Sequence, residues 1–128
     1  MTHALYALPH SLYSGRARSY LIKNNIPFQE FSCGHESFKT EIVPDAKLAT
    51  IPVLRTDEGQ VIRDGAAIIE YFEAANGRPC LPATPKQQIV SGLFDLIGAE
   101  GLLRPATHYP WNFPEENLSS LHYHLFHA

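Results

Sequence analysis

The stretch TIPVLRTDEGQVIRDGAAIIEYF, residues 50–72, carries most of the information about the fold. Residues 51–55 are strand-like, and residues 60–63 return after the glycine-containing turn of residues 56–59. Two short runs around such a turn predict a β-hairpin. Residues 65–73 then place apolar side chains at helical spacing. The stretch is therefore predicted to form strand, turn, strand and helix.

The residues before this stretch extend it into a small α/β domain. Residues 4–8 form a short apolar run that predicts a buried strand, and residues 27–31 alternate as a second strand does. A helix is predicted between them, capped by Ser14 and ending near Asn25, and residues 35–42 are interpreted as a short helix. The predicted order is β-α-β-α-β-β-α, which is typical of a mixed sheet with helical crossovers. The buried side of the first helix is predicted to contain Ala17, Tyr20, Leu21 and Ile22.

The residues after it are predicted to be a linker followed by helices. Residues 78–86 hold three prolines, and a helix is predicted to begin at Pro85 with Thr84 as its N-cap. Residues 104–114 also hold three prolines and are predicted not to form a regular helix. Residues 115–126 are amphipathic. We expect the apolar faces of these helices to be covered in an oligomer, and the chain to be shorter than its ancestral architecture.

Composition excludes several classes of function. The 128 residues carry a net charge of −3, so a generic nucleic-acid binder, which needs a basic excess, is excluded. No apolar run approaches the roughly 20 residues that span a bilayer. The first residues lack the pattern of a signal peptide, which favours the cytoplasm. Cys33 and Cys80 match no metal or redox spacing, and in that reducing compartment we expect two thiols rather than a disulfide.

Three positions are candidates for chemistry, and each also has a purely structural interpretation. Ser11 precedes a helix N-terminus, which favours a bound anion, or it simply caps the helix. Pro52 opens a strand, either as an edge-strand proline or after a cis peptide bond. Asp64 is either an N-cap or, with the N–H groups of Gly65 and Ala66, a site for the two charges of an amino-acid zwitterion.

In this order and spacing, the motifs resemble those of the glutathione S-transferase superfamily. The matching features are the Ser-x-x-Ser-x-Arg-x-Arg turn of residues 11–18, the Ile-Pro-Val-Leu strand start of residues 51–54, and the acidic–small pair that begins residues 64–72. The resemblance implies a thioredoxin-like glutathione-binding domain over residues 1–81. It implies a partial, truncated all-helical C-terminal domain over residues 86–128, where the family carries four or more helices.

The resemblance also implies roles for single residues at the two helix starts. Ser11 occupies the position of the catalytic group that contacts the glutathione sulfur in serine and cysteine classes. The position of the tyrosine-class catalytic residue is Ala7 here, and Tyr6 is expected on the other face of its strand. Asp64 and Gly65 match the pair that holds the γ-glutamyl end. The family's usual serine is replaced by Gly65, so one hydroxyl donor, worth about 1 kcal/mol, is lost.

The remaining implied contacts lie around the strand start at residue 52. The backbone of Ile51, before an implied cis Pro52, would pair with the cysteinyl part of glutathione. Thr50 falls where a lysine or glutamine often reaches the glycyl carboxylate, and His35 is a further candidate there. No metal is implied; the spacing of His122, His124 and His127 is typical of surface histidines, with metal binding as the alternative.

The activity implied by the resemblance is that of a cytoplasmic, homodimeric glutathione transferase. Glutathione would be the co-substrate, and its activated thiol would attack a small electrophile. A non-catalytic glutathione-binding or protein-interaction module with an incomplete electrophile pocket is the alternative. A glutaredoxin-like disulfide oxidoreductase is disfavoured, because Ser11 and Ser14 stand where that chemistry needs a low-pKa cysteine.

Overall fold

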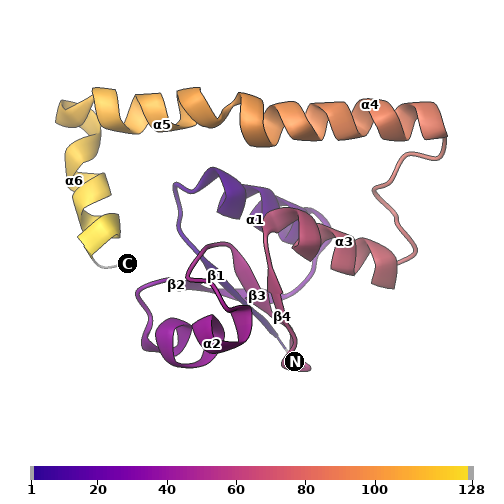
Figure 1. The fold of residues 1–128 in the computed structure, drawn as a ribbon, viewed down its shortest axis with the longest axis horizontal. Coiled ribbons are helices and arrows are strands. Elements are labelled where there is room, and N and C mark those ends of the chain that lie inside the picture. The colour runs from indigo at the N-terminus through magenta and orange to yellow at the C-terminus, as the bar shows by residue number, and fades with distance from the viewer. Residues whose placement is uncertain (1, 127–128) are drawn as a thin grey trace. The chain divides into compact units, whose positions relative to one another are not determined.

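The computed structural model describes residues 2–126 and contains the predicted sheet unit followed by helices (Figure 1). It divides into two compact units, residues 2–72 and residues 73–126, with the third α-helix crossing the division. The sheet unit runs β1 (His3–Ala7), α1 (Leu12–Lys23), β2 (Phe28–Ser32), the π-helical turn η1 (Phe38–Ile42), α2 (Val43–Ala46), β3 (Val53–Arg55), β4 (Val61–Arg63) and α3 (Gly65–Ala75). The helical unit adds α4 (Pro85–Leu96), the π-helical turn η2 (Ile97–Gly101), α5 (Leu103–Asn112) and α6 (Pro114–Phe126).

The sheet confirms the predicted β-α-β-α-β-β-α order. Its four strands are arranged β2-β1-β3-β4. Strand β1 pairs with β2 in parallel, whereas β1 with β3 and β3 with β4 are antiparallel. The parallel pair needs a helical crossover, which α1 supplies, and the antiparallel pair β3–β4 needs only the short turn that the sequence predicts. This is the mixed sheet of a thioredoxin-like α/β fold.

Apolar side chains pack on both faces of the sheet because successive residues of a strand point to opposite faces. Within β1, Leu5 and Ala7 belong to one buried cluster and Tyr6 belongs to the other. The first cluster joins the sheet to α1 and α3, through Ala17, Leu21, Leu54, Ile68 and Phe72. The second joins it to η1 and α2, through Phe38, Ile42, Ala46 and Val53. In Figure 1, α1 and α3 accordingly cover one face of the sheet and α2 the other.

The predicted start of the first helix is wrong by three residues. Ser11 is the N-cap of α1: its backbone is extended and its side chain accepts a hydrogen bond from the Ser14 N–H. Ser14 lies inside the helix and is fully buried. Both serines satisfy the sequence pattern of a cap, and only the backbone conformation distinguishes them. On the predicted buried side, Ala17, Tyr20 and Leu21 are buried, but Ile22 is 61% exposed.

The prediction that residues 104–114 are not helical is also wrong, because most of that stretch is α5. Pro105 lies in the first turn of α5, where a backbone N–H has no partner within the helix to lose. Pro114 opens α6 in the same way, so of the three prolines in residues 104–114, all of them described, Pro110 is the one that lies beyond the first turn of its helix. The predicted capping of α4 is confirmed, since the Thr84 side chain accepts a hydrogen bond from the Gln87 N–H.

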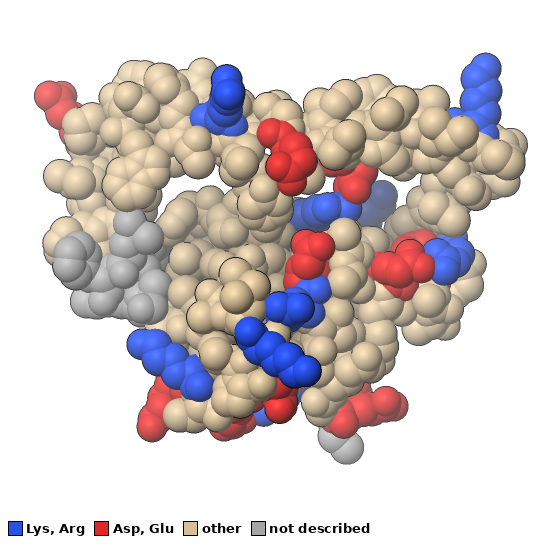
Figure 2. All heavy atoms as spheres, viewed as in Figure 1, with Lys and Arg blue, Asp and Glu red and all other residues tan. Residues whose placement is uncertain are grey.

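The helices of the second unit expose much of their apolar surface. No residue of α4 is buried, and Ile89 and Phe94 are 67% and 70% exposed. On the face shown in Figure 2, charged side chains are sparse over this unit compared with the sheet unit. Between residues 2 and 126, no helix has the length and apolar character needed to cross a membrane.

Candidate functional site at the loop edge of the sheet

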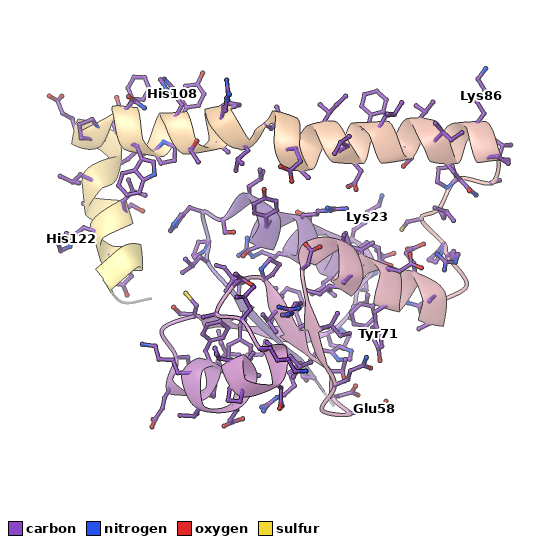
Figure 3. The ribbon with its side chains drawn as sticks, in the orientation of Figure 1. Lys23, Glu58, Tyr71, Lys86, His108 and His122 are labelled. Carbon is purple, nitrogen blue, oxygen red and sulfur yellow. The ribbon has the colours of Figure 1, made fainter. Side chains whose placement is uncertain are left out.

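The three candidate positions from the sequence, Ser11, Pro52 and Asp64, lie at the same edge of the sheet. Tyr6 in β1 is opposite Val53 in β3, and Val53 is opposite Arg63 in β4. Because these pairs are antiparallel, the end of β1, the start of β3 and the end of β4 lie together. The loop to α1, the Ile-Pro dipeptide before β3 and the start of α3 therefore meet at this loop edge. The β3–β4 turn, which contains Glu58, lies at the opposite end (Figure 3).

Two helix N-termini begin at the loop edge, those of α1 and α3. Each presents backbone N–H groups and about half a positive charge, which favours a thiolate or carboxylate nearby. Ser11 caps α1. Its Oγ accepts the Ser14 N–H at 3.3 Å, which uses an oxygen lone pair and leaves the hydroxyl proton to be donated. Capping α1 is thus compatible with donating a hydrogen bond to an anion.

The peptide bond between Ile51 and Pro52 is cis, as the resemblance implies. Pro52 is fully buried, and its carbonyl oxygen accepts the Asp64 N–H at 3.1 Å. This hydrogen bond joins the segment before β3 directly to the residue before α3. Ile51 is half-buried and packs against the hydrophobic cluster that joins the sheet to η1 and α2. Thr50, next to it, is exposed.

Asp64 has the left-handed backbone that the start of α3 requires, with φ at 75°. Aspartate and asparagine tolerate this conformation better than most residues. The exposed Asp64 carboxylate accepts the Ala66 N–H through Oδ1 at a long 3.4 Å, and the Asp64 carbonyl accepts the Ile68 N–H at 3.0 Å. Asp64 therefore caps α3 and still presents a charged group at the loop edge.

Gly65 brings the start of α3 against the first turn of α1. A Cβ atom at this position would lie 3.1 Å from the Tyr13 carbonyl oxygen and 3.6 Å from the Arg16 side chain. This close approach gives a physical reason for glycine where the resemblance implies a serine. It also places the Asp64–Gly65 pair beside the turn that Ser11 begins.

Substitutions at Gly65 and Gly15 are expected to act in opposite directions on stability. Nothing lies within 4 Å of a Cβ at Gly15, so Gly15→Ala should stabilise the chain by about 0.5–1 kcal/mol through helix propensity. Gly65→Ala should instead destabilise it by about 1 kcal/mol, because a backbone carbonyl must move. Urea denaturation of both variants measures this. Equal stabilisation by the two would contradict the close approach of α3 to α1.

His35 is engaged locally. Its Nδ1 atom lies 2.7 Å from the Ser37 Oγ, which lies 2.9 Å from the Tyr6 hydroxyl, and its ring contacts Phe31 edge-on. The imidazole is exposed, so its role toward a glycyl carboxylate stays a prediction.

Tyr6 is buried on the face opposite to Ala7, as the alternation of the strand predicts.

The two cysteines are thiols, as expected. Burial raises the pKa of the half-buried Cys33 thiol, which lowers its reactivity. Neither cysteine lies in the turn that begins α1, and among the side chains that the structure describes there is no group of three or more metal-ligating residues. His122 projects from α6 (Figure 3), whereas the side chain of His124 and the whole of His127 lie outside the described residues.

Sequence reasoning missed the residues that hold the Ser11 loop. The Ser14 hydroxyl accepts the Leu8 N–H at 3.4 Å, and the Arg18 guanidinium donates to the Leu8 carbonyl oxygen at 3.1 Å. Both side chains belong to the serine–arginine turn that the sequence singled out. The turn itself does not reveal that they bind the backbone at the end of β1, because that contact depends on how α1 packs beside the strand.

Comparisons with known proteins point to one family. Residues 5–80 match the family model for the glutathione S-transferase N-terminal domain. Glutathione S-transferase 2 of Saccharomyces cerevisiae is 30% identical over 111 residues, covering 82% of this chain and 48% of that protein. The chain thus spans about half the length of the curated relative it matches.

Solved structures of such proteins share the fold. A glutathione S-transferase from Rhodospirillum rubrum superposes with a TM-score of 0.70 at 20% identity, covering 80% of this chain and 47% of that one. One from Methylobacterium radiotolerans, solved with glutathione sulfonate, has a TM-score of 0.64 at 19% identity, covering 76% of this chain and 46% of that one.

Proposed function

The chain belongs to the glutathione S-transferase family, and from this premise we propose that it binds glutathione at the loop edge and activates its thiol for attack on a small electrophile. The observation that carries the proposal is the meeting of three features at that edge. These are the hydroxyl-capped start of α1, the cis Ile51–Pro52 peptide and the Asp64 carboxylate at the start of α3. Each is suited to a different part of the tripeptide.

In this proposal, the charges of glutathione decide its orientation. The Asp64 carboxylate pairs with the γ-glutamyl ammonium group, and the N–H groups at the start of α3 face the adjacent carboxylate. A ligand carboxylate there competes with the long Ala66–Asp64 hydrogen bond. The cysteinyl part pairs with the backbone of Ile51, and Thr50 lies on the side of the glycyl carboxylate.

Thiolate formation is the chemical step that the residues of the chain assist. A free thiol with a pKa near 8.5 is only a few per cent ionised at pH 7. A hydrogen bond donated by the Ser11 hydroxyl, together with the positive end of α1, favours the thiolate. The sulfur then attacks an electrophilic carbon; a carbon–sulfur bond forms and the leaving group departs with its electron pair. Ser11 acts as a donor and never as the nucleophile.

Thermal unfolding with and without millimolar glutathione tests the binding step. A ligand at 100 times its dissociation constant adds about 2.7 kcal/mol to the free energy of unfolding, which raises the midpoint by several degrees. S-methylglutathione, which has no thiol, is expected to give a similar shift. A cooperative transition that neither ligand moves would contradict the proposed site. Binding without conjugate formation would favour a non-catalytic glutathione-binding module.

We also propose that the protein is a cytoplasmic homodimer. Exposed apolar side chains on α4, such as Ile89, Leu93 and Phe94, support an oligomer, and the thiols Cys33 and Cys80 are compatible with a reducing compartment. Light scattering on the purified chain should give twice the mass of the 14.3 kDa monomer. Phe94→Asp should reduce the mass to that of the monomer. A wild-type monomer at micromolar concentration would contradict the dimer.

A further inference from the structure

A hydrogen-bonded chain runs from β2 through α1 to the loop that holds Ser11. Glu30 in β2 accepts two hydrogen bonds from Arg18 in α1, from Nε at 2.7 Å and from Nη2 at 2.6 Å. The same Nη2 atom donates to the Leu8 carbonyl oxygen at 3.1 Å. That carbonyl also accepts the Ser11 N–H at 3.2 Å. The Leu8 carbonyl is therefore the acceptor shared by the guanidinium and by the backbone of Ser11.

Several features distinguish this arginine from an ordinary surface cation. The side chains of Arg18 and Glu30 are 22% and 29% exposed. A two-point arginine–carboxylate pair fixes the plane of the guanidinium, which a single contact does not. The hydrogen bonds to Glu30 also raise the pKa of Arg18 above its ordinary value. Glu30 thus orients a planar donor that reaches the backbone just after β1.

We propose that Arg18, oriented by Glu30, is a positioning residue that places the Ser11 hydroxyl for thiolate stabilisation. This inference rests on the proposed function. The loop from Leu8 to Ser11 is tied to α1 by the Ser14 side chain and the capping bond of Ser11. Arg18 adds a hydrogen bond that fixes the Leu8 carbonyl, which also accepts the Ser11 N–H. A hydrogen-bond donor that shifts by a few tenths of an ångström loses much of its effect on a bound anion.

Arg18→Met and Arg18→Lys are the informative variants, and the ultraviolet absorbance of bound glutathione thiolate is the readout. Arg18→Met should raise the apparent pKa of the bound thiol by about one unit, a tenfold loss of thiolate at neutral pH. Arg18→Lys keeps the charge but not the planar fork, so it should behave like Arg18→Met. The affinity for S-methylglutathione should stay within about twofold in both, since that ligand has no thiol to ionise.

Arg55→Met is the matched control. Arg55 also pairs with a glutamate, Glu41, but this pair joins β3 to η1 instead of reaching the loop that holds Ser11. In Arg55→Met, the bound glutathione thiol should have the same apparent pKa as in the wild-type protein. If Arg18→Met titrates like wild type, or if Arg18→Lys restores the wild-type pKa, the positioning role is wrong. Should Arg18→Met fail to fold, Glu30→Gln carries the same test, with an expected loss of thiolate of about threefold.

A measurement without ligand separates this inference from the proposed function. In the unliganded protein, the Ser11 amide should exchange its hydrogen about tenfold faster in Arg18→Met than in wild type, because its acceptor is less fixed. Unchanged exchange would overturn the inference whether or not glutathione binds. Wild-type protein that does not bind glutathione, with faster exchange in the variant, would overturn the proposed function and retain Arg18 as the residue that holds the loop.

Discussion

Asp64→Asn is expected to weaken glutathione binding by about tenfold or more, with little loss of stability. The substitution removes the charge that pairs with the γ-glutamyl ammonium group, and a hydrogen bond to a charged group contributes about 1.5–3 kcal/mol. Asparagine tolerates the left-handed backbone at this position and caps a helix about as well as aspartate. The loss should therefore appear in the dissociation constant measured by calorimetry and not in the urea midpoint.

Asp57→Asn is the control for this prediction. Asp57 is in the β3–β4 turn at the opposite end of the sheet, where its carboxylate lies 3.4 Å from the His3 Nδ1 atom. Asp57→Asn changes the net charge by the same amount as Asp64→Asn and should leave the affinity for glutathione unchanged. Equal affinities of Asp64→Asn and wild type would show that the γ-glutamyl end binds elsewhere. Equal losses in both variants would assign the effect to net charge instead of to the site.

Ser11→Gly is expected to reduce thiolate formation strongly while preserving binding. Glycine is nearly as good an N-cap as serine, so α1 should lose only a few tenths of a kcal/mol, whereas alanine should cost about 1 kcal/mol. The lost hydrogen bond should raise the apparent pKa of the bound thiol by about one to two units, a tenfold to hundredfold loss of thiolate at neutral pH.

Titrating the ultraviolet absorbance of the bound thiolate measures this effect. Ser14→Ala is a useful comparison, because it removes the hydroxyl that binds the Leu8 N–H and leaves Ser11 in place. We expect a smaller rise in pKa there, together with a loss of stability, since Ser14 is fully buried. Wild-type thiolate formation in Ser11→Gly would mean that the helix end alone stabilises the anion, and that Ser11 only caps α1.

Local sequence chemistry predicted the parts of the fold that depend on neighbouring residues. The hairpin of β3 and β4 and the helix that follows could be read directly, because a glycine turn and an apolar helical period are short-range signals. The cis peptide before Pro52 came from the resemblance, since the residues alone left an edge-strand proline as the alternative. Ser11 and Asp64 were candidates from the residues alone, each with a structural alternative; the structure shows that both cap a helix, and their roles toward glutathione stay predictions.

The wrong predictions concern helix starts, whose positions depend on tertiary structure. Ser11 and Ser14 both satisfy the pattern of a cap, and only the helix start at Leu12 distinguishes them. Pro105 and Pro114 suggested a break, but a proline in the first turn of a helix costs no hydrogen bond, and the sequence does not show where the turn begins. The close approach of Gly65 to the Tyr13 carbonyl and the Arg18–Glu30 pair each involve separate elements, so no local pattern reveals them.

The measurement that tests the central claim most directly is a nuclear magnetic resonance titration of the isotopically labelled chain with glutathione. Binding at the loop edge predicts that the amide signals of Ser11, Ile51 and residues 64–66 shift together, with one dissociation constant. The amides of the β3–β4 turn, around Glu58, should stay in place. Shifts concentrated at that turn or in the helical unit, or no saturable shift at all, would contradict the account.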